Sequence, residues 1–262
     1  MTFAQALDAS GLEPREARLL LAAAAGVPEA SIIAFPERQL PSDAGASFLS
    51  FAARRIAGEP FAYIVQRKEF HGIALRVTPA VLIPRPETEL LVDLALEREF
   101  SSAVDLGTGS GAIALALKRE RPAATVIGVD RSKAALEVAR ENARACALEV
   151  QWRHGDWYAP LAGERFELIV ANPPYVAAGD PHLAGLHYEP FDALISGADG
   201  LDAIRAIVHA APAHLAPGGW LLLEHGAGQH AAVQALFAQA GLEEVTPWPD
   251  LAGIARVCGG RR

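Results

Sequence analysis

The chain has 262 residues, enough for one large domain or two unequal ones. Hydrophobic residues make up 51% of it, which supports a packed core and excludes disorder for most of the chain. The 23 basic and 31 acidic residues give a net charge of −8, which argues against a protein that depends on nucleic-acid phosphates. Cys146 and Cys258 are far apart in the chain, which excludes a disulfide scaffold or a cysteine-based zinc site and favours a reducing cytoplasm.

Residues 1–60 are expected to form a small helical domain. Apolar residues recur at three- and four-residue spacing in residues 14–26, prolines then divide the region into short helices, and residues 43–56 predict another helix. No basic stretch followed by an apolar one begins the chain, so no secretory signal is expected. The longest uncharged stretch, residues 206–223, is broken by prolines and glycines, so no membrane span is expected.

Residues 61–82 are expected to form a linker hairpin, because β-rich runs lie on both sides of His71-Gly72. After them, residues 82–97 predict a helix with Pro86 in its first turn. Strand and helix patterns then alternate to the end of the chain, so residues 83–262 predict an α/β domain with a doubly wound, mostly parallel sheet. Its seven strands are expected at residues 101–106, 125–130, 148–154, 166–172, 219–226, 243–248 and 254–259.

A glycine-rich segment, Asp-Leu-Gly-Thr-Gly-Ser-Gly at residues 105–111, follows the first of these strands. Glycines at a strand-to-helix turn let a ligand approach the main chain closely. The spacing is not the G-x-G-x-x-G of dinucleotide-binding loops. The carboxylate of Asp105 would repel a pyrophosphate but could face an ammonium group, which favours S-adenosylmethionine as the ligand. Ordinary turn glycines are the alternative.

Two further positions at strand ends suit a nucleoside. Asp130 lies 23 residues after Gly107, where a carboxylate can accept hydrogen bonds from both ribose hydroxyls. The alternative for Asp130 is a helix N-cap. After the third strand, Trp157 could flank an adenine ring and Asp156 could accept from its amino group, although a tryptophan in this position is more often part of the packing.

The most informative segment is Asn172-Pro173-Pro174-Tyr175, at the end of the strand 166–172. Consecutive prolines force a rigid loop and offer carbonyl acceptors without N–H donors. The Asn172 side chain adds an acceptor, and Tyr175 a ring face. Two acceptors can hold both protons of a planar NH₂ group and direct its lone pair at a sulfonium methyl, so the segment predicts methyl transfer to an amide or amine nitrogen. A structural turn is the alternative.

These motifs, with Leu-Ile-Pro-Arg-Pro-Glu-Thr-Glu at residues 82–89 and Ser-Gly-Ala-Asp-Gly-Leu-Asp at residues 196–202, resemble those of the HemK-type release factor glutamine methyltransferases. The resemblance covers essentially the whole chain. It implies a Rossmann-like methyltransferase sheet, S-adenosylmethionine as methyl donor, S-adenosylhomocysteine as product and no metal. The substrate would be the glutamine of the Gly-Gly-Gln motif in class-1 peptide chain release factors.

The same resemblance implies roles for individual residues. Asn172, Pro173 and Tyr175 would be catalytic, with the Asn172 side chain and the Pro173 carbonyl accepting the amide protons. Pro174, Arg85 and Glu87 would join them on the substrate side. The cofactor would contact Asp105, Gly107, Thr108, Gly109, Ser110, Gly111, Asp130, Asp156, Trp157 and Asn172. The helical domain would dock the release factor, and a cytoplasmic monomer with no membrane attachment and no direct nucleic-acid requirement is expected.

Three other functions compete. An adenine-N6 methyltransferase acting on DNA or RNA shares the Asn-Pro-Pro-Tyr motif, but the net charge of −8 and the lack of a basic target domain argue against it. A nicotinamide-dependent oxidoreductase would need the G-x-G-x-x-G loop, which is absent. A non-catalytic module could bind the cofactor without turnover.

Overall fold

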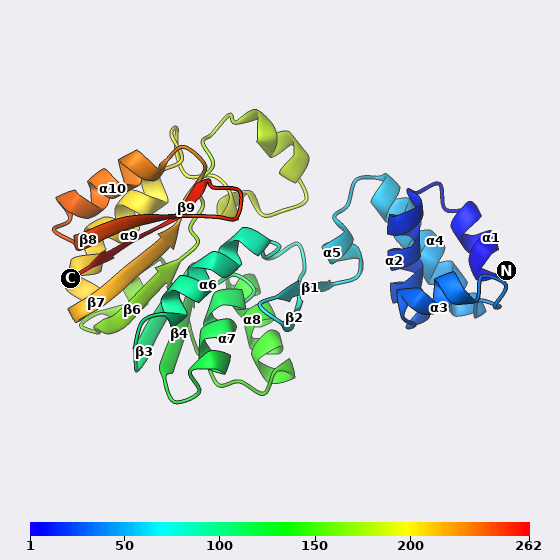
Figure 1. The fold of residues 1–262 in the computed structure, drawn as a ribbon, viewed down its shortest axis with the longest axis horizontal. Helices are drawn as coiled ribbons and strands as arrows, with labels where there is room; N and C mark the ends of the chain where they lie inside the picture. Colours follow the sequence, from blue (N-terminus) through cyan, green and yellow to red (C-terminus); the bar gives the residue numbers. More distant parts are fainter. The chain divides into compact units, whose positions relative to one another are not determined.

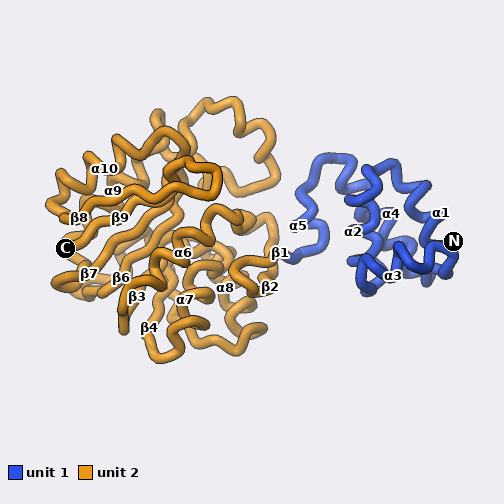
Figure 2. Tube along the Cα trace, in the orientation of Figure 1, with its two compact units in different colours: residues 1–67 blue, residues 68–262 orange.

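The computed structural model describes residues 1–262, and its helices and strands are labelled in Figure 1. The chain divides into two compact units, Met1–Arg67 and Lys68–Arg262 (Figure 2). The division falls inside the segment expected to be a separate linker. No helix in either unit has the length and apolar character needed to cross a membrane.

The first unit is built from helices, and strand β1 begins at its last residue, Arg67. Its core consists of large apolar side chains that are almost fully buried, among them Phe3, Leu20, Leu21, Ile32 and Phe48. Several helices begin directly after a proline or with one, as the punctuation of the sequence predicts. The helices are α1 (Phe3–Asp8), α2 (Pro14–Ala25), α3 (Glu29–Ala34), α4 (Ser42–Ile56) and α5 (Phe61–Ile64).

Helix α5 corrects one prediction, because Phe61–Ile64 was expected to be extended and to belong to the hairpin. The carbonyl of Pro60 accepts hydrogen bonds from the third and fourth residues after it, at 3.0 and 3.2 Å, and this local turn makes the segment helical in spite of its β-rich composition. The hairpin itself is present but shorter. It consists of β1 (Arg67–Phe70) and β2 (Ile73–Arg76), with His71 at positive φ in the turn.

The second unit is built on a seven-stranded sheet in the order β5-β4-β3-β6-β7-β9-β8. All neighbouring pairs from β5 to β7 are parallel, and β9 runs antiparallel to both β7 and β8. The prediction of a doubly wound, mostly parallel α/β sheet is therefore confirmed. The strands are β3 (Ser102–Leu106), β4 (Thr125–Asp130), β5 (Gln151–His154), β6 (Phe166–Ala171), β7 (Leu215–Glu224), β8 (Glu243–Pro249) and β9 (Ala255–Arg261).

Helices cover both faces of this sheet (Figure 1). Alternate residues along the strands divide between two apolar clusters: Ala103 packs with α6 and α7 on one face, and its neighbour Val104 packs with α9 and α10 on the other. The α-helices are α6 (Glu89–Leu96), α7 (Ala112–Glu120), α8 (Lys133–Ala145), α9 (Asp202–His214) and α10 (His230–Gln239). Short 3₁₀ helices are η1 (Pro86–Thr88), η2 (Ala159–Leu161), η3 (Pro181–Leu186) and η4 (Phe191–Ala193).

The register of the central strands decides where the chemistry-bearing loops lie. Leu106, the last residue of β3, pairs with Val129 of β4 on one side and with Ala171, the last residue of β6, on the other. The three strands therefore end at nearly the same level. The glycine-rich segment, Asp130 and the Asn-Pro-Pro-Tyr loop follow at one edge of the sheet, where α/β proteins bind their ligands.

Candidate active site

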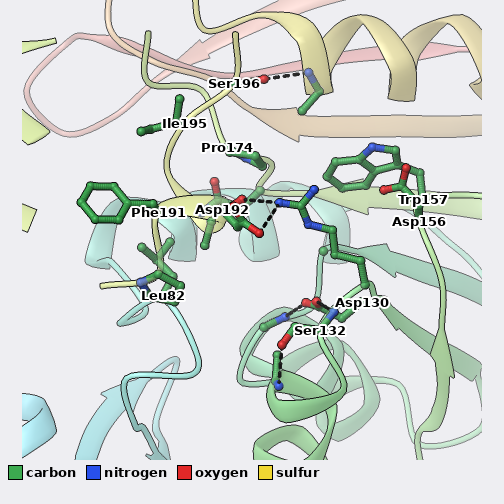
Figure 3. A pocket seen from close by; sticks show the side chains of 18 of the residues that line it. Leu82, Asp130, Ser132, Asp156, Trp157, Pro174, Phe191, Asp192, Ile195 and Ser196 are labelled. Carbon is green, nitrogen blue, oxygen red and sulfur yellow. Dashed lines mark hydrogen bonds and ion pairs between the residues drawn. The ribbon is translucent and has the colours of Figure 1, made fainter. Parts of the chain in front are cut away.

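A cavity of about 870 Å³ lies at this edge of the sheet (Figure 3). Its volume is within the range of small-molecule sites. Two segments distant in sequence, residues 80–82 and 190–197, complete its wall. The cavity brings together seven of the predicted site residues, which are Gly107, Gly109, Asp130, Asp156, Trp157, Asn172 and Pro174.

The glycine loop presents bare backbone to the cavity. Gly107 and Gly109 have φ of 76° and 54°, in the left-handed region that favours glycine. A Cβ at Gly107 would also lie 3.3 Å from the Trp157 indole, so a glycine lets this ring approach the loop. A Cβ at Gly109 would meet no atom within 4 Å, so a ligand can approach the main chain there.

Asp105 does not line the cavity. Its side chain is completely buried. Its Oδ2 accepts hydrogen bonds from the Thr108 hydroxyl at 2.6 Å and from the Ala114 amide at 3.3 Å, whereas Oδ1 has no partner. Burial raises the pKa of Asp105 to about 7, and the two hydrogen bonds only partly oppose this rise. Thr108, Ser110 and Gly111 are likewise absent from the cavity lining.

Asp130 is held at the cavity wall by two backbone amides (Figure 3). Its Oδ2 accepts from the Gly109 amide at 2.9 Å, and its Oδ1 accepts from the Ser132 amide at 2.8 Å. Burial raises the pKa of Asp130, although both hydrogen bonds favour its charged form. The N-cap alternative does not apply, because the Ser132 hydroxyl caps α8 by accepting from the Ala135 amide at 3.2 Å.

The Asn-Pro-Pro-Tyr loop is anchored from behind by two polar contacts. Asn172 donates through Nδ2 to the Thr88 hydroxyl at 3.0 Å. Tyr175 donates through its hydroxyl to Glu224 Oε1 at 3.1 Å. Burial first, and then the Glu224 carboxylate, raise the pKa of the Tyr175 phenol, so this side chain stays neutral. Pro173 and Tyr175 do not contribute to the cavity lining.

Residues 83–88, which lead into α6, support the site rather than lining it. Arg85 forms an ion pair with the buried Glu189, which also accepts from the Ile83 amide at 3.0 Å. Glu87 is exposed. Neither Arg85 nor Glu87 lines the cavity.

Several residues at or beside the cavity carry no signal in the sequence. Arg131 and Asp192, both in the cavity lining, form an ion pair at 3.0 Å (Figure 3). Ser196 accepts from the Ala203 amide at 2.7 Å and so ties the cavity wall to α9. The motif at residues 196–202 was the only sequence signal for this wall. Glu224 follows an apolar run, and nothing in the sequence indicates its contact with Tyr175.

The cavity fits S-adenosylmethionine in three respects. Backbone at Gly109 is accessible, Asp130 offers a carboxylate beside it, and the Trp157 ring faces the same space. The unpartnered Oδ1 of Asp105 adds negative charge under the loop, which suits a cationic ligand. No feature of the lining requires a phosphate-bearing ligand.

Comparison with known proteins gives matches over both units. The PrmC N-terminal domain family matches residues 2–65, and the methyltransferase small domain family matches residues 86–187. A release factor glutamine methyltransferase from Burkholderia pseudomallei is 48% identical over 273 residues, covering 99% of this chain and 96% of its own length. One from Coxiella burnetii is 43% identical over 264 residues, covering 98% of this chain and 95% of its own.

Solved structures show the same fold. A T. thermophilus 16S rRNA methyltransferase in complex with AdoMet and guanosine is 24% identical, with a TM-score of 0.56, and the match covers 75% of this chain and 49% of that one. At this level of identity the likeness concerns the fold alone.

Proposed function

The chain belongs to the release factor glutamine methyltransferases, and from this membership we propose that it methylates the side-chain amide nitrogen of a release factor glutamine. The observation that carries the proposal is the Asn-Pro-Pro-Tyr loop at the cavity wall. The Nδ2 of Asn172 is engaged with Thr88, which leaves Oδ1 of the same amide free to accept from a substrate.

The proposed mechanism depends on positioning. S-adenosylmethionine supplies an electrophilic methyl group on a positively charged sulfur. Asn172 Oδ1 and the Pro173 carbonyl accept the two N–H protons of the glutamine amide and orient its nitrogen lone pair. The nitrogen would bond to the methyl carbon as the sulfur–methyl bond breaks, and one N–H proton of the product would then pass to solvent water. Because the N–H bonds become more acidic as the nitrogen gains positive charge, both acceptors would bind more strongly in the transition state than before it. No strong base is needed for this step.

Cofactor contacts follow from the same cavity. We propose that Gly107 and Gly109 contact the cofactor through their backbone, that Asp130 accepts from its ribose hydroxyls, and that Asp156 and Trp157 hold its adenine. Asp105, with Thr108, Ser110 and Gly111, would support the loop from beneath. The product would be S-adenosylhomocysteine, and no metal takes part in the proposed step.

The substrate side extends beyond the cavity. We propose that the glutamine lies in the Gly-Gly-Gln motif of a class-1 peptide chain release factor, that Pro174 and Tyr175 pack on its amide, and that the helical residues 1–60 dock the protein. Arg85 and Glu87 would act near the entrance. The protein would work as a monomer in the cytoplasm.

The rival substrate is an adenine in DNA or RNA, whose exocyclic amine would suit the same acceptors. The matches over residues 2–65 and over nearly the full length favour the release factor. Incubation with labelled S-adenosylmethionine should transfer label to a purified release factor and to no nucleic acid. Label on nucleic acid alone would overturn the proposal.

Replacing the central acceptor tests the mechanism within the same assay. Asn172→Ala should lower kcat by at least about tenfold, because one transition-state acceptor is lost. Its affinity for S-adenosylmethionine, measured by calorimetry, should stay near that of the unchanged protein. An unaltered kcat would exclude the role given to Asn172.

A further inference from the structure

Glu224 is a buried carboxylate directly behind the reacting loop. It ends β7, the neighbour of β6 in the sheet, and only 1% of its surface is exposed. Its Oε1 accepts from the Tyr175 hydroxyl at 3.1 Å. Its Oε2 is buried and has no hydrogen-bond partner, whereas the nearby Thr88 hydroxyl lowers the pKa of the carboxyl. A buried carboxylate oxygen without a hydrogen-bond partner is rare in folded proteins, so its presence beside the site suggests a role for Glu224.

Thr88 connects this acid to Asn172. The Thr88 side chain is 3% exposed, and its oxygen accepts from Asn172 Nδ2 at 3.0 Å. A hydroxyl has one proton to donate. If this proton points to Glu224, the lone pairs of Thr88 face Asn172, and the asparagine can meet them only with its NH₂ group. The Oδ1 atom of Asn172 is then left as an acceptor.

Some neighbours of Glu224 favour its ionised form and others oppose it. Burial raises its pKa, and the nearby Glu87 acts in the same direction. The hydroxyls of Thr88 and Tyr175 and the positive charge of Arg256 oppose this rise. An ionised carboxylate accepts hydrogen bonds and donates none, which is the property that the two hydroxyls require.

We propose that Glu224 and Thr88 are positioning residues that fix which end of the Asn172 amide acts on the substrate, while Glu224 also holds the Tyr175 ring in place. The inference rests on the proposed function. An amide whose two ends are nearly equal in shape would otherwise present oxygen or nitrogen to the substrate. Only the oxygen can accept the glutamine N–H protons.

Glu224→Gln tests the proposal with almost no change of shape. The new amide offers one acceptor and one NH₂ group, so it cannot accept from both hydroxyls. Either Thr88 reverses and the Asn172 amide turns, or Tyr175 loses its acceptor. We expect kcat on release factor to fall at least about tenfold, while the Kd for S-adenosylmethionine and the Tm change little. Glu167→Gln is the matched control, because Glu167 accepts from the Ser101 hydroxyl at 2.9 Å at the other end of β6 and should keep full activity.

A second pair of variants separates the hydroxyl from the packing. Thr88→Val keeps the shape and removes the hydroxyl, so it should lose kcat as Glu224→Gln does. Thr88→Ser keeps the hydroxyl and should retain kcat within about threefold. A Glu224→Gln enzyme with kcat within twofold of the unchanged protein, or equal losses in Thr88→Ser and Thr88→Val, would overturn the inference. An unchanged protein that fails to methylate release factor would instead overturn the proposed function.

Discussion

Asp105 carries a conflict between the stability of the fold and the binding of a cation. The carboxyl is fully buried, one of its oxygens has no partner, and burial raises its pKa to about 7. The unfolded chain therefore releases this proton at a lower pH than the folded protein does. Because the unfolded state binds fewer protons between the ordinary value of 3.8 and about 7, the ionisation of Asp105 lowers the stability as the pH rises through this window.

Asp105→Asn should separate the two effects. The new amide oxygen can still accept from Thr108 and Ala114, but the side chain no longer ionises. Without cofactor, its Tm relative to the unchanged protein should be higher at pH 8 than at pH 5. Its affinity for S-adenosylmethionine should fall, whereas the affinity of the unchanged protein should rise as the pH passes 7. Thermal unfolding and calorimetry measure both, and a Tm difference independent of pH would contradict this account.

At the residue scale, local signals in the sequence indicated residues that line the cavity, such as Asp130 and Asn172, but not the contacts between residues far apart in the chain. Asp130 and Asn172 could be predicted because a strand end and a motif mark each of them. The Thr88 contact with Asn172 spans 84 positions and the Glu224 contact with Tyr175 spans 49. Such contacts can be predicted only when the order of the strands in the sheet is known, because no local sequence pattern indicates them.

Gly128 shows how one strand position controls the loop beside it. It lies inside β4, and a Cβ there would be 2.4 Å from the Trp152 ring and 3.0 Å from the Thr108 hydroxyl. Trp152 belongs to β5, and Thr108 holds Asp105 in the glycine loop. The missing side chain therefore provides the space that an indole fills between the sheet and the loop.

Gly128→Ala should destabilise the protein by about 1–3 kcal/mol, because the added methyl overpacks a close contact. Urea unfolding measures the change, and weaker binding of S-adenosylmethionine should accompany it as Thr108 shifts. Gly185→Ala is the control: Gly185 has no atom within 4 Å of an added Cβ and an ordinary φ. Equal stability of the two variants would contradict the packing argument.

At the element scale, alternation of strands and helices was enough to predict the sheet, but composition misled at Phe61–Ile64. The central strands β3, β4, β6 and β7 are buried almost continuously, which gives apolar runs in the sequence, although β5 and β8 contain no buried residue. The four residues of α5 are instead helical because the carbonyl of Pro60 accepts hydrogen bonds from their amides. A prediction from composition does not take such a contact into account. Short elements between larger ones are decided by such single contacts.

The whole molecule combines two units with different charge. The first unit has 6 basic and 7 acidic residues, and the second has 17 basic and 24 acidic residues, so most of the negative charge accompanies the cavity. Each unit has apolar clusters of its own. The division of labour proposed above, docking in one unit and chemistry in the other, matches this separation of cores.

A chain that begins at Arg67 tests this division, since it keeps the hairpin and both clusters of the second unit. It should bind S-adenosylmethionine with nearly the affinity of the full chain, while kcat/KM on release factor should fall at least about tenfold because the docking surface is lost. Calorimetry and the methylation assay measure the two quantities. Full activity of the shortened chain would exclude a docking role for the helical unit.

The place of β6 in the middle of the sheet has a further consequence for the lifetime of the enzyme. Its neighbours β3 and β7 pair with it on both sides and protect its amides from hydrogen exchange. The loop that follows β6 contains two prolines, which have no exchangeable amide. Segments of this kind open only when the whole domain opens. Loss of activity on heating should then coincide with global unfolding of the second unit, and amide hydrogen exchange along β6 should report the same event.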